Sequence, residues 1–493
     1  MCTDRGIRGN KVKIHSVKFN ALMNFILKIS LYIFPIITFP YVTRVLQVDG
    51  IGQISFATSV VSYFVMLSSL GIPNYGIKAC AIVRDDKKKL TKTVQELLAI
   101  SLIVTVIAYV VFFVLLFAVP KFRAMKTLLI IDSMLLIFNA LGVEWFYQAI
   151  EQYSYITIRN LIFKSASLIL VFLLVRDQSD IYTYALITVI ATSGSNVLNF
   201  LNLRKYIYLK PQCNLDLAKH IKPTLIFFAT SVAISVYTQL DTVMLGLMTN
   251  NHEVGLYSGA MKIQTVLTVL VASVDNVLLP RMAHYVATGE KNDFNDLVVK
   301  MTYYNVFLGG LITVFFFIYT SPVISLISGN GYLEAGPAVK WLLLTIIPVG
   351  LSSMTGAQIM ASIGKEKHHM YSVLAGGITD FLLNLIVIPK FGAAGAAFST
   401  AVTEVVVLAM DVMFIKNLIA VIKGKVKWWK TGVSLVMSVV VGLLIYRLQF
   451  HYILKLMVGF ILMAIVYVGL LIILRDDFIM DEANKVRARF RHG

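Results

Sequence analysis

Charged residues are scarce in this sequence. Only 14% of its 493 residues are Asp, Glu, Lys or Arg, whereas 58% are hydrophobic. The mean hydropathy is +0.79. Soluble globular domains carry about 25% charged residues, so this composition excludes an ordinary soluble protein. It indicates a chain that lies almost entirely in a membrane.

Cysteine is also rare. The three cysteines, Cys2, Cys80 and Cys213, fall in segments that we expect on the cytoplasmic side. Thiols in that compartment stay reduced, so the sequence predicts no disulfide bond.

Motifs for nucleotide hydrolysis, metal binding and covalent catalysis are missing. The sequence has no G-x-x-x-x-G-K-[ST] loop, so we do not expect it to hydrolyse ATP. Its eight histidines fall in expected loops or termini and lack the spacing of zinc ligands. No Cys-His or Ser-His arrangement suggests a nucleophile. We therefore expect no enzyme activity, no cofactor and no metal.

Long apolar runs dominate what is present. A spanning helix needs about 20 mainly apolar residues, and about fourteen runs meet this requirement. The sequence thus predicts an all-α polytopic membrane protein with about 14 transmembrane helices. The runs centre on residues 17–39, 52–72, 94–118, 124–147, 158–175, 181–203, 223–249, 255–280, 299–320, 336–361, 368–388, 392–415, 428–447 and 451–474.

The net charge of +18 would suggest a nucleic-acid partner in a soluble protein. Here most Lys and Arg fall in alternate loops, which is the positive-inside pattern of membrane proteins. This pattern predicts that both termini are cytoplasmic. We expect the basic face to meet anionic membrane lipids and expect no nucleic-acid partner.

A weak internal repeat divides the chain. Gly52 in "DGIGQISFATS" and Gly255 in "EVGLYSGAMK" each open a predicted helix, are followed by x-x-Ser, and lie 203 residues apart. After six spans the chain is back on its original side of the membrane, so the two repeats have the same orientation. The repeat therefore predicts two parallel lobes of six helices, which move against each other around a central site. The predicted parts are an N-terminal lobe at 1–210, a C-terminal lobe at 211–420, and a further helix pair with a basic cytoplasmic tail at 421–493.

A family resemblance that spans nearly the whole chain is carried by four stretches, residues 39–81, 144–160, 237–263 and 383–404. In these stretches the sequence resembles the polysaccharide transport family, whose Wzx-type members are oligosaccharide-lipid flippases related to the multidrug and toxic-compound extruders (MATE). One residue departs from the family pattern: Gln47 stands where we expect Gly, at the turn after "RVL".

The resemblance implies a function. Family members move an undecaprenyl-pyrophosphate-linked oligosaccharide from the inner to the outer leaflet of the bacterial plasma membrane, for O-antigen, capsule or exopolysaccharide synthesis. The resemblance also implies a MATE-like fold of two lobes and a mechanism of alternating access. It implies that a polysaccharide polymerase and assembly proteins are further partners. The alternatives are a multidrug or cation extruder and a peptidoglycan-precursor flippase of the same superfamily. A membrane glycosyltransferase or polymerase is less favoured, because no large loop carries catalytic acids or arginines.

Cations and amides inside the apolar runs are candidates for binding the cargo. A charge at the bilayer centre costs about 2.5 to 3.5 kcal/mol, so it normally faces a partner or a watered cavity. Lys28 has Asn24 one turn earlier on the same face, and it either attracts a pyrophosphate or pairs with an acid. Lys164 lies nearer the cytoplasm and either joins the cavity or reaches the headgroups. Asn196 and Asn199 present amides either to sugars or to another helix.

Buried acids are candidates for coupling transport to an ion. Asp241 and Lys262 each lie roughly 10 to 12 Å below the outer ends of consecutive helices, at 1.5 Å per residue. We therefore predict that they pair, either permanently or by exchange with a diphosphate. Three further acids are potential proton carriers because burial favours the neutral form of a carboxyl group: Asp132, Glu404 and Asp380, the last forming an i, i+4 polar stripe with Asn384.

Overall fold

A computed structural model describes residues 16–208, 210, 214–482 and 484. Cys2 and Cys213 lie outside the described residues, as do most of the predicted basic segments at the two termini. The predictions made for those segments are therefore not addressed by the structure.

The described residues are helical and contain no strand, which confirms the predicted all-α class. Among the described residues, ten helices are long and apolar enough to cross a membrane, or up to twelve if each of two bent helix pairs is one span. Helices α1 (Val17–Ser69) and α16 (Glu366–Phe414) each cover two of the predicted apolar runs. The count of about 14 spans is not confirmed and stays a prediction.

Both long helices break at a residue with left-handed backbone geometry. Gln47 in α1 has φ 57° and ψ −178°, a region that is essentially restricted to glycine, which explains why glycine is expected there. In α16 the break is at Gly392, with φ 53°. A Cβ at Gly392 would lie 2.3 Å from a carboxylate oxygen of Glu253, and the same oxygen accepts a hydrogen bond of 2.7 Å from the amide of Ala393. The acid thus caps the second half of α16.

The chain divides into two compact units, which are described separately. Unit 1 contains Met1–Leu46 and Ala57–Val236, and unit 2 contains Gln47–Phe56 and Tyr237–Gly493. Helix α10 (Ala218–Met248) passes from the first unit to the second. The predicted lobe boundaries at 210 and 420 stay predictions.

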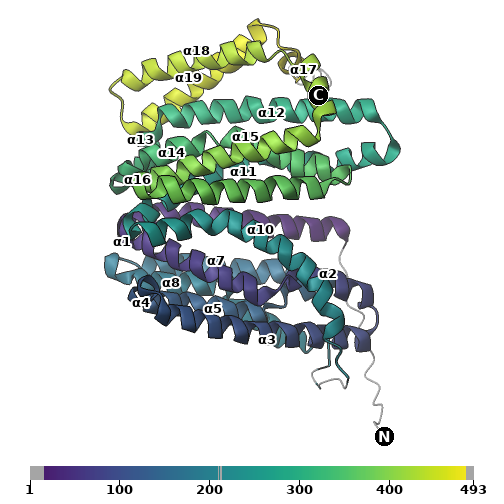
Figure 1. Ribbon diagram of the computed structural model, residues 1–493. Coiled ribbons are helices and arrows are strands. Elements are labelled where there is room, and N and C mark those ends of the chain that lie inside the picture. The colour runs from purple at the N-terminus through teal and green to yellow at the C-terminus, as the bar shows by residue number, and fades with distance from the viewer. Residues whose placement is uncertain (1–15, 209, 211–213, 483, 485–493) are drawn as a thin grey trace. The chain divides into compact units, whose positions relative to one another are not determined.

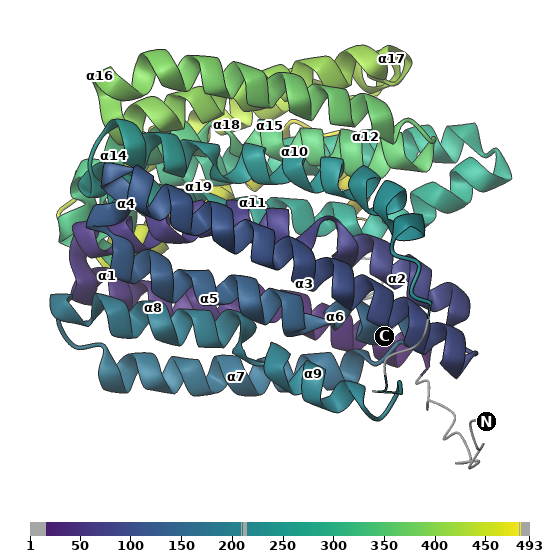
Figure 2. The ribbon, with the colours of Figure 1, turned by 60° about the horizontal axis from the view of Figure 1, so that its bottom comes forward.

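Unit 1 is built from neighbouring helices that follow a common direction. α5 packs between α3 and α8, and α7 packs beside α8 (Figure 2). The short helix α6 packs against α2 and buries Phe146 and Tyr147 completely. Besides parts of α1 and α10, unit 1 contains α2 (Ile72–Val83), α3 (Lys87–Ala118), α4 (Pro120–Ala124), α5 (Lys126–Gly142), α6 (Glu144–Ala149), α7 (Tyr153–Leu174), η1 (Gln178–Asp180), α8 (Ile181–Val189), η2 (Ile190–Gly194) and α9 (Asn196–Leu203).

Unit 2 has a core of long helices and a helix pair at its end. α11 packs against both α12 and α16, while α18 and α19 form a pair beside α12 (Figure 1). The hydroxyl of the fully buried Tyr319 donates to the carbonyl of Gly442 over 3.0 Å and ties the pair to the core. Unit 2 contains α11 (Asn251–Thr288), α12 (Lys291–Ile318), α13 (Thr320–Ile327), η3 (Asn330–Ala335), α14 (Gly336–Leu343), α15 (Ile346–Ser353), η4 (Met354–Met360), α16, α17 (Lys416–Lys425), α18 (Trp428–Arg447) and α19 (Tyr452–Ile473).

Residues 47–56 of α1 cross the start of α11 with backbone in contact with backbone. A Cβ added at Gly52 would lie 1.8 Å from the carbonyl oxygen of Asn251, and one added at Gly255 would lie 2.1 Å from that of Val48. The two contacts are equivalent under the 203-residue offset, because Val48 corresponds to Asn251 and Gly52 to Gly255. This reciprocal packing supports the internal repeat and explains why both positions are glycine.

Candidate functional site

Three carboxylates meet inside unit 2. Asp241 comes from α10, and Asp380 and Glu404 come from the two halves of α16. Their exposed fractions are 8%, 4% and 7%, respectively. The break at Gly392 folds α16 back on itself, which explains how one helix can supply two acids that are far apart in the sequence.

Asp241 is held by hydroxyl and amide donors. Thr400 Oγ1 donates to its Oδ2 over 2.8 Å, and Asn384 Nδ2 donates to its Oδ1 over 2.6 Å. The hydroxyl of Tyr257 also donates to Oδ2. α10, α11 and α16 therefore all contribute to the environment of this one carboxylate.

Asn384 bridges two of the acids. Its Nδ2 also donates to Asp380 Oδ2 over 3.1 Å, so the two carboxylates lie one hydrogen-bond length from the same nitrogen. This contact confirms that Asp380 and Asn384 share a helix face. Thr403 Oγ1 lies 3.3 Å from Asp380 Oδ1. The side-chain oxygen of Asn384 is buried and has no hydrogen-bond partner among the described residues, which leaves one acceptor unused beside the two acids.

Glu404 forms a second layer of the same site. The hydroxyl of Tyr237 donates to its Oε1. Tyr237 lies one turn before Asp241 on α10, and Glu404 lies one turn after Thr400 on α16. Helices α10 and α16 thus meet in two contacts one turn apart, and in each of them a hydroxyl group donates to a carboxylate.

No cation neutralises the cluster within the described part of the chain. None of the recorded ion pairs involves Asp241, Asp380 or Glu404. Three buried carboxylates cannot all carry charge without compensation, because an unpaired buried ion loses its hydration energy. The arrangement can therefore take up positive charge as protons. In residues 16–208, 210, 214–482 and 484 no group of three His, Cys, Asp or Glu side chains could hold a metal ion.

The predicted ion pair between Asp241 and Lys262 is wrong for the described structure. The donors to Asp241 are Tyr257, Asn384 and Thr400. Lys262 is exposed and has no recorded partner among the described residues. It follows Tyr257 by five residues, which places it about 140° around α11 at 3.6 residues per turn. Tyr257 and Lys262 therefore leave different faces of α11, and it is Tyr257 that contacts Asp241.

The cations predicted for the cargo lie in different surroundings in unit 1. Lys28 is exposed and Asn24 is half-buried, and neither has a recorded partner among the described residues. Lys164 Nζ lies 3.1 Å from Ser30 Oγ and over the ring of Phe34. It therefore packs against α1.

The remaining predicted residues contact neighbouring helices. Asp132 is 3% exposed and accepts a hydrogen bond of 2.9 Å from Thr58. Asn199 is fully buried and donates to the carbonyl of Gly142 over 2.5 Å. The amide of Asn196 packs where a Cβ at Gly142 would lie. For these two amides the structure favours helix packing, which was one of the two alternatives that the sequence left open.

A buried guanidinium in unit 1 was missed in the sequence analysis. Arg159 is 4% exposed, and its Nη2 lies 3.5 Å from Glu144 Oε2. Its Nε and Nη1 are buried and have no hydrogen-bond partner in the part of the chain that the structure describes. Arg159 lies at the edge of the predicted run 158–175, where the sequence alone does not distinguish a loop cation from a buried one.

A second missed cluster anchors the start of α10 within unit 1. Glu96 is fully buried and accepts from Lys219 Nζ over 2.7 Å and from the backbone amide of Asp216 over 2.8 Å. His220 Nε2 lies 2.9 Å from the same carboxylate, and its Nδ1 lies 2.8 Å from the hydroxyl of Tyr75. Glu96 lies inside the predicted run 94–118, so the rule that selected Asp132 could have selected it too.

Comparison with known proteins identifies relatives along most of the chain. A family model described as "Polysaccharide biosynthesis protein" matches residues 17–286, which is more than half of the 493 residues. A second model, MatE, matches residues 227–386. The chain is 23% identical over 412 residues to a protein of Escherichia coli K12 named "Putative O-antigen transporter", covering 82% of this chain and 97% of the relative.

Further matches agree in fold and family. The chain is 22% identical over 380 residues to the capsular polysaccharide biosynthesis protein CapF of Staphylococcus aureus, covering 75% of this chain and 92% of the relative. The solved structure of the lipid II flippase MurJ in an inward closed conformation superposes with a TM-score of 0.65 at 14% identity, over 92% of this chain and all of that one. This likeness shows a MurJ-like helical fold. The helical, multi-span structure and the match over residues 17–286 together show that the chain belongs to the polysaccharide biosynthesis protein family.

Proposed function

We propose that this protein is a flippase that moves undecaprenyl-pyrophosphate-linked oligosaccharide units across the bacterial plasma membrane, for the synthesis of a surface polysaccharide. The observation that carries the proposal is the match to a relative named for O-antigen transport, which extends over 97% of that relative. In this proposal the protein is a transporter and not an enzyme. Both termini are cytoplasmic, and a polymerase and assembly proteins act on the cargo after it has been moved.

The mechanism is alternating access of two lobes. We assign residues 1–210 and 211–420 to these lobes and residues 421–493 to an added helix pair and tail. The exposed Lys28 and Lys262 attract the diphosphate of the cargo, while the lipid tail stays in the bilayer. Support for this role comes from the exposure of both side chains and from their lack of a recorded partner in the described part of the chain.

The carboxylate cluster couples transport to a cation in this mechanism. Asp241, Asp380 and Glu404 have no recorded ion pair with a cation in the described part of the chain, and the side-chain oxygen of Asn384 offers one more acceptor. Uptake of a proton removes the repulsion between Asp241 and Asp380. A cation can drive a conformational change only through its different affinity for the two states. We therefore expect the cluster to be accessible from opposite sides in the two states.

The experiment is a flipping assay in reconstituted vesicles. A fluorescent undecaprenyl-pyrophosphate-linked oligosaccharide is placed in one leaflet, and its arrival in the other is measured with an impermeant quencher. Wild type is compared with Lys28→Gln, Lys262→Gln and protein-free vesicles. We expect wild type to accelerate flipping and the two variants to reduce the rate. A wild-type rate equal to that of empty vesicles would reject the function, and unchanged rates in both variants would reject their assignment to the cargo.

One alternative is kept because of the fold. The solved structure with a TM-score of 0.65 is titled a lipid II flippase, so a peptidoglycan precursor is a second candidate cargo. The two candidates differ in the sugar and share the lipid and diphosphate. Equal flipping of lipid II and of the oligosaccharide-linked lipid would favour this alternative, whereas a preference for the oligosaccharide supports the proposal. A multidrug or cation extruder would instead move a cationic dye and neither lipid.

A further inference from the structure

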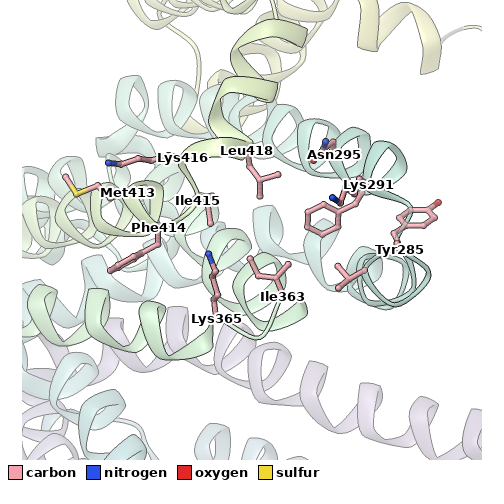
Figure 3. A pocket seen from close by; sticks show the side chains of 13 residues that line it. Tyr285, Lys291, Asn295, Ile363, Lys365, Met413, Phe414, Ile415, Lys416 and Leu418 are labelled. Carbon is pink, nitrogen blue, oxygen red and sulfur yellow. The ribbon is translucent and has the colours of Figure 1, made fainter.

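A cavity with an apolar floor and basic walls lies at one end of unit 2. It has a volume of about 460 Å³. Four segments that turn at this end form it: the end of α11, the start of α12, the residues before α16, and the junction of α16 with α17 (Figure 3). Because several helices begin or end here, we expect the cavity to lie where the chain leaves the membrane. The charge distribution predicts that this end faces the cytoplasm.

The walls of the cavity carry uncompensated positive charge. Lys291, Lys365 and Lys416 line it, and no Asp or Glu is among its described lining residues. Each of these lysines is exposed, and none of their ammonium groups has a recorded ion pair or hydrogen bond within the described ranges. In Figure 3, Lys365 and Lys291 come from different sides of the cavity, whereas Lys416 lies at its rim.

A neighbouring cavity shows the opposite arrangement. It has a volume of about 730 Å³, and its cations lie beside acids. Lys300 Nζ lies 2.9 Å from Glu482, and Asp293 and Asp296 also line the space. Charge there is balanced within the protein, so a bound anion is not needed. Of these two cavities, the smaller one is lined by lysines without neighbouring acids.

The floor of the smaller cavity is hydrocarbon. Phe294 and Ile415 are 8% and 5% exposed and close its base. Ile363, Phe414 and Leu418 extend the apolar surface. Few neutral hydrogen-bonding groups are present, so the lining does not suit a sugar. A free phosphate would satisfy the lysines but would leave the apolar floor uncovered.

We propose that this cavity binds an anionic phospholipid, with the phosphate held by Lys291 and Lys365 and the start of an acyl chain covering Phe294, Ile415 and Leu418. A membrane lipid combines a phosphate and hydrocarbon within the size of the cavity. Residues of four separate segments contact the same lipid, so the bound lipid fastens α11, α12, α16 and α17 together at this end of unit 2. The site is independent of the cargo proposal, because it is built entirely from unit 2 and does not include Asp241, Asp380 or Glu404.

Lipid binding to the purified protein in a neutral detergent tests the proposal, with bound lipid counted by native mass spectrometry. The probes are dioleoylphosphatidylglycerol and dioleoylphosphatidylcholine, which share their acyl chains and differ in net charge. We expect tighter binding of phosphatidylglycerol to the wild-type protein. The variant Lys291→Gln/Lys365→Gln should weaken this binding about 25-fold, because each lysine near an anionic headgroup contributes a factor of about five.

Two further variants separate the cavity from general surface charge. Lys367→Gln/Lys423→Gln removes the same charge from exposed positions of α16 and α17 that do not line the cavity, and it should change binding less than about threefold, since exposed charges are screened within about 10 Å at 0.1 M salt. Leu418→Trp narrows the cavity without changing charge and should also weaken phosphatidylglycerol binding. Equal losses in the two double variants, or no effect of Leu418→Trp, would overturn the proposal.

Competition identifies the occupant. If glycerol phosphate displaces phosphatidylglycerol at equal concentration, the cavity is a site for free phosphate and the proposal of a lipid site is rejected. Undecaprenyl pyrophosphate that binds through Lys291 and Lys365 more tightly than phosphatidylglycerol would show a cargo site and reject it as well. Retention of phosphatidylglycerol against both competitors is the result we expect.

Discussion

The crossing of residues 47–56 with α11 allows a quantitative test of the packing. Replacing Gly52 with Ala places a methyl carbon 1.8 Å from the carbonyl oxygen of Asn251, whereas ordinary van der Waals contact begins at 3.4 Å. The obstacle is backbone, so no side chain can rotate away and the two helices must separate. Overpacking of this kind costs about 1 to 3 kcal/mol. We expect a loss near the upper end, about 3 kcal/mol, because Val48 and Phe56 on the same segment are buried.

The partner glycine supplies a double-mutant cycle. Gly255→Ala places its methyl 2.1 Å from the carbonyl oxygen of Val48 and should cost a similar amount. Once one methyl has separated the helices, the second meets less resistance. The double variant should therefore be clearly less destabilised than the sum of the two single variants, with a coupling of about 1 kcal/mol or more, as expected for residues that share one contact.

Equilibrium unfolding in mixed micelles of a mild detergent and sodium dodecyl sulfate measures these effects. Gly377→Ala is the matched control, because Gly377 is also a helical glycine of unit 2 and an added Cβ would meet nothing within 4 Å. Its stability should stay unchanged or rise by up to about 1 kcal/mol, the difference in helix propensity. If Gly52→Ala were as stable as Gly377→Ala, or if the two crossing variants were additive, the close approach would be refuted.

Three further predictions concern the breaks and the buried acids. Asp241→Asn removes a charge and keeps the shape, so we expect the flipping rate to lose its dependence on a proton or sodium gradient; a gradient dependence equal to that of wild type would remove Asp241 from the coupling site. Gln47→Gly relieves a backbone conformation that costs about 1 to 3 kcal/mol and should raise the unfolding free energy by about 1 kcal/mol after the added chain entropy of glycine, which the same unfolding assay measures. Glu96→Gln removes the charge that holds Lys219 and His220. Loss of one partner of a buried pair costs about 3 to 5 kcal/mol, and because the Lys219 side chain is 43% exposed we expect about 2 to 3 kcal/mol; an unfolding midpoint equal to that of wild type would contradict this role.

The sequence predicted the class of the fold but not every contact. Length of apolar runs is a local property, so the membrane-spanning, all-helical character could be read directly. The break at Gln47 was also visible, since glycine was expected at that turn. The number of spans could not be fixed, because α1 and α16 each continue through a break that a hydropathy pattern records as two runs.

The candidate site was predicted in part. Asp241, Asp380, Glu404 and Asn384 were selected because ionisable and amide groups are costly within apolar helices. The i, i+4 relation of Asp380 and Asn384 depends on one helix alone and was correct. The partner of Asp241 was predicted wrongly, because depth along a helix says nothing of its rotation about its own axis.

By itself, the sequence determined where charge and polarity enter the membrane-spanning helices, since each such residue must be placed by the covalent chain. Tertiary packing decided which of them meet. It brought Asp241 to the two halves of α16, gave Glu96 its donors from the start of α10, and collected Lys291, Lys365 and Lys416 around one cavity. The physical reason is that helical periodicity fixes the direction of a side chain only relative to its own helix, whereas close approaches such as that at Gly52 fix how neighbouring helices are rotated and spaced.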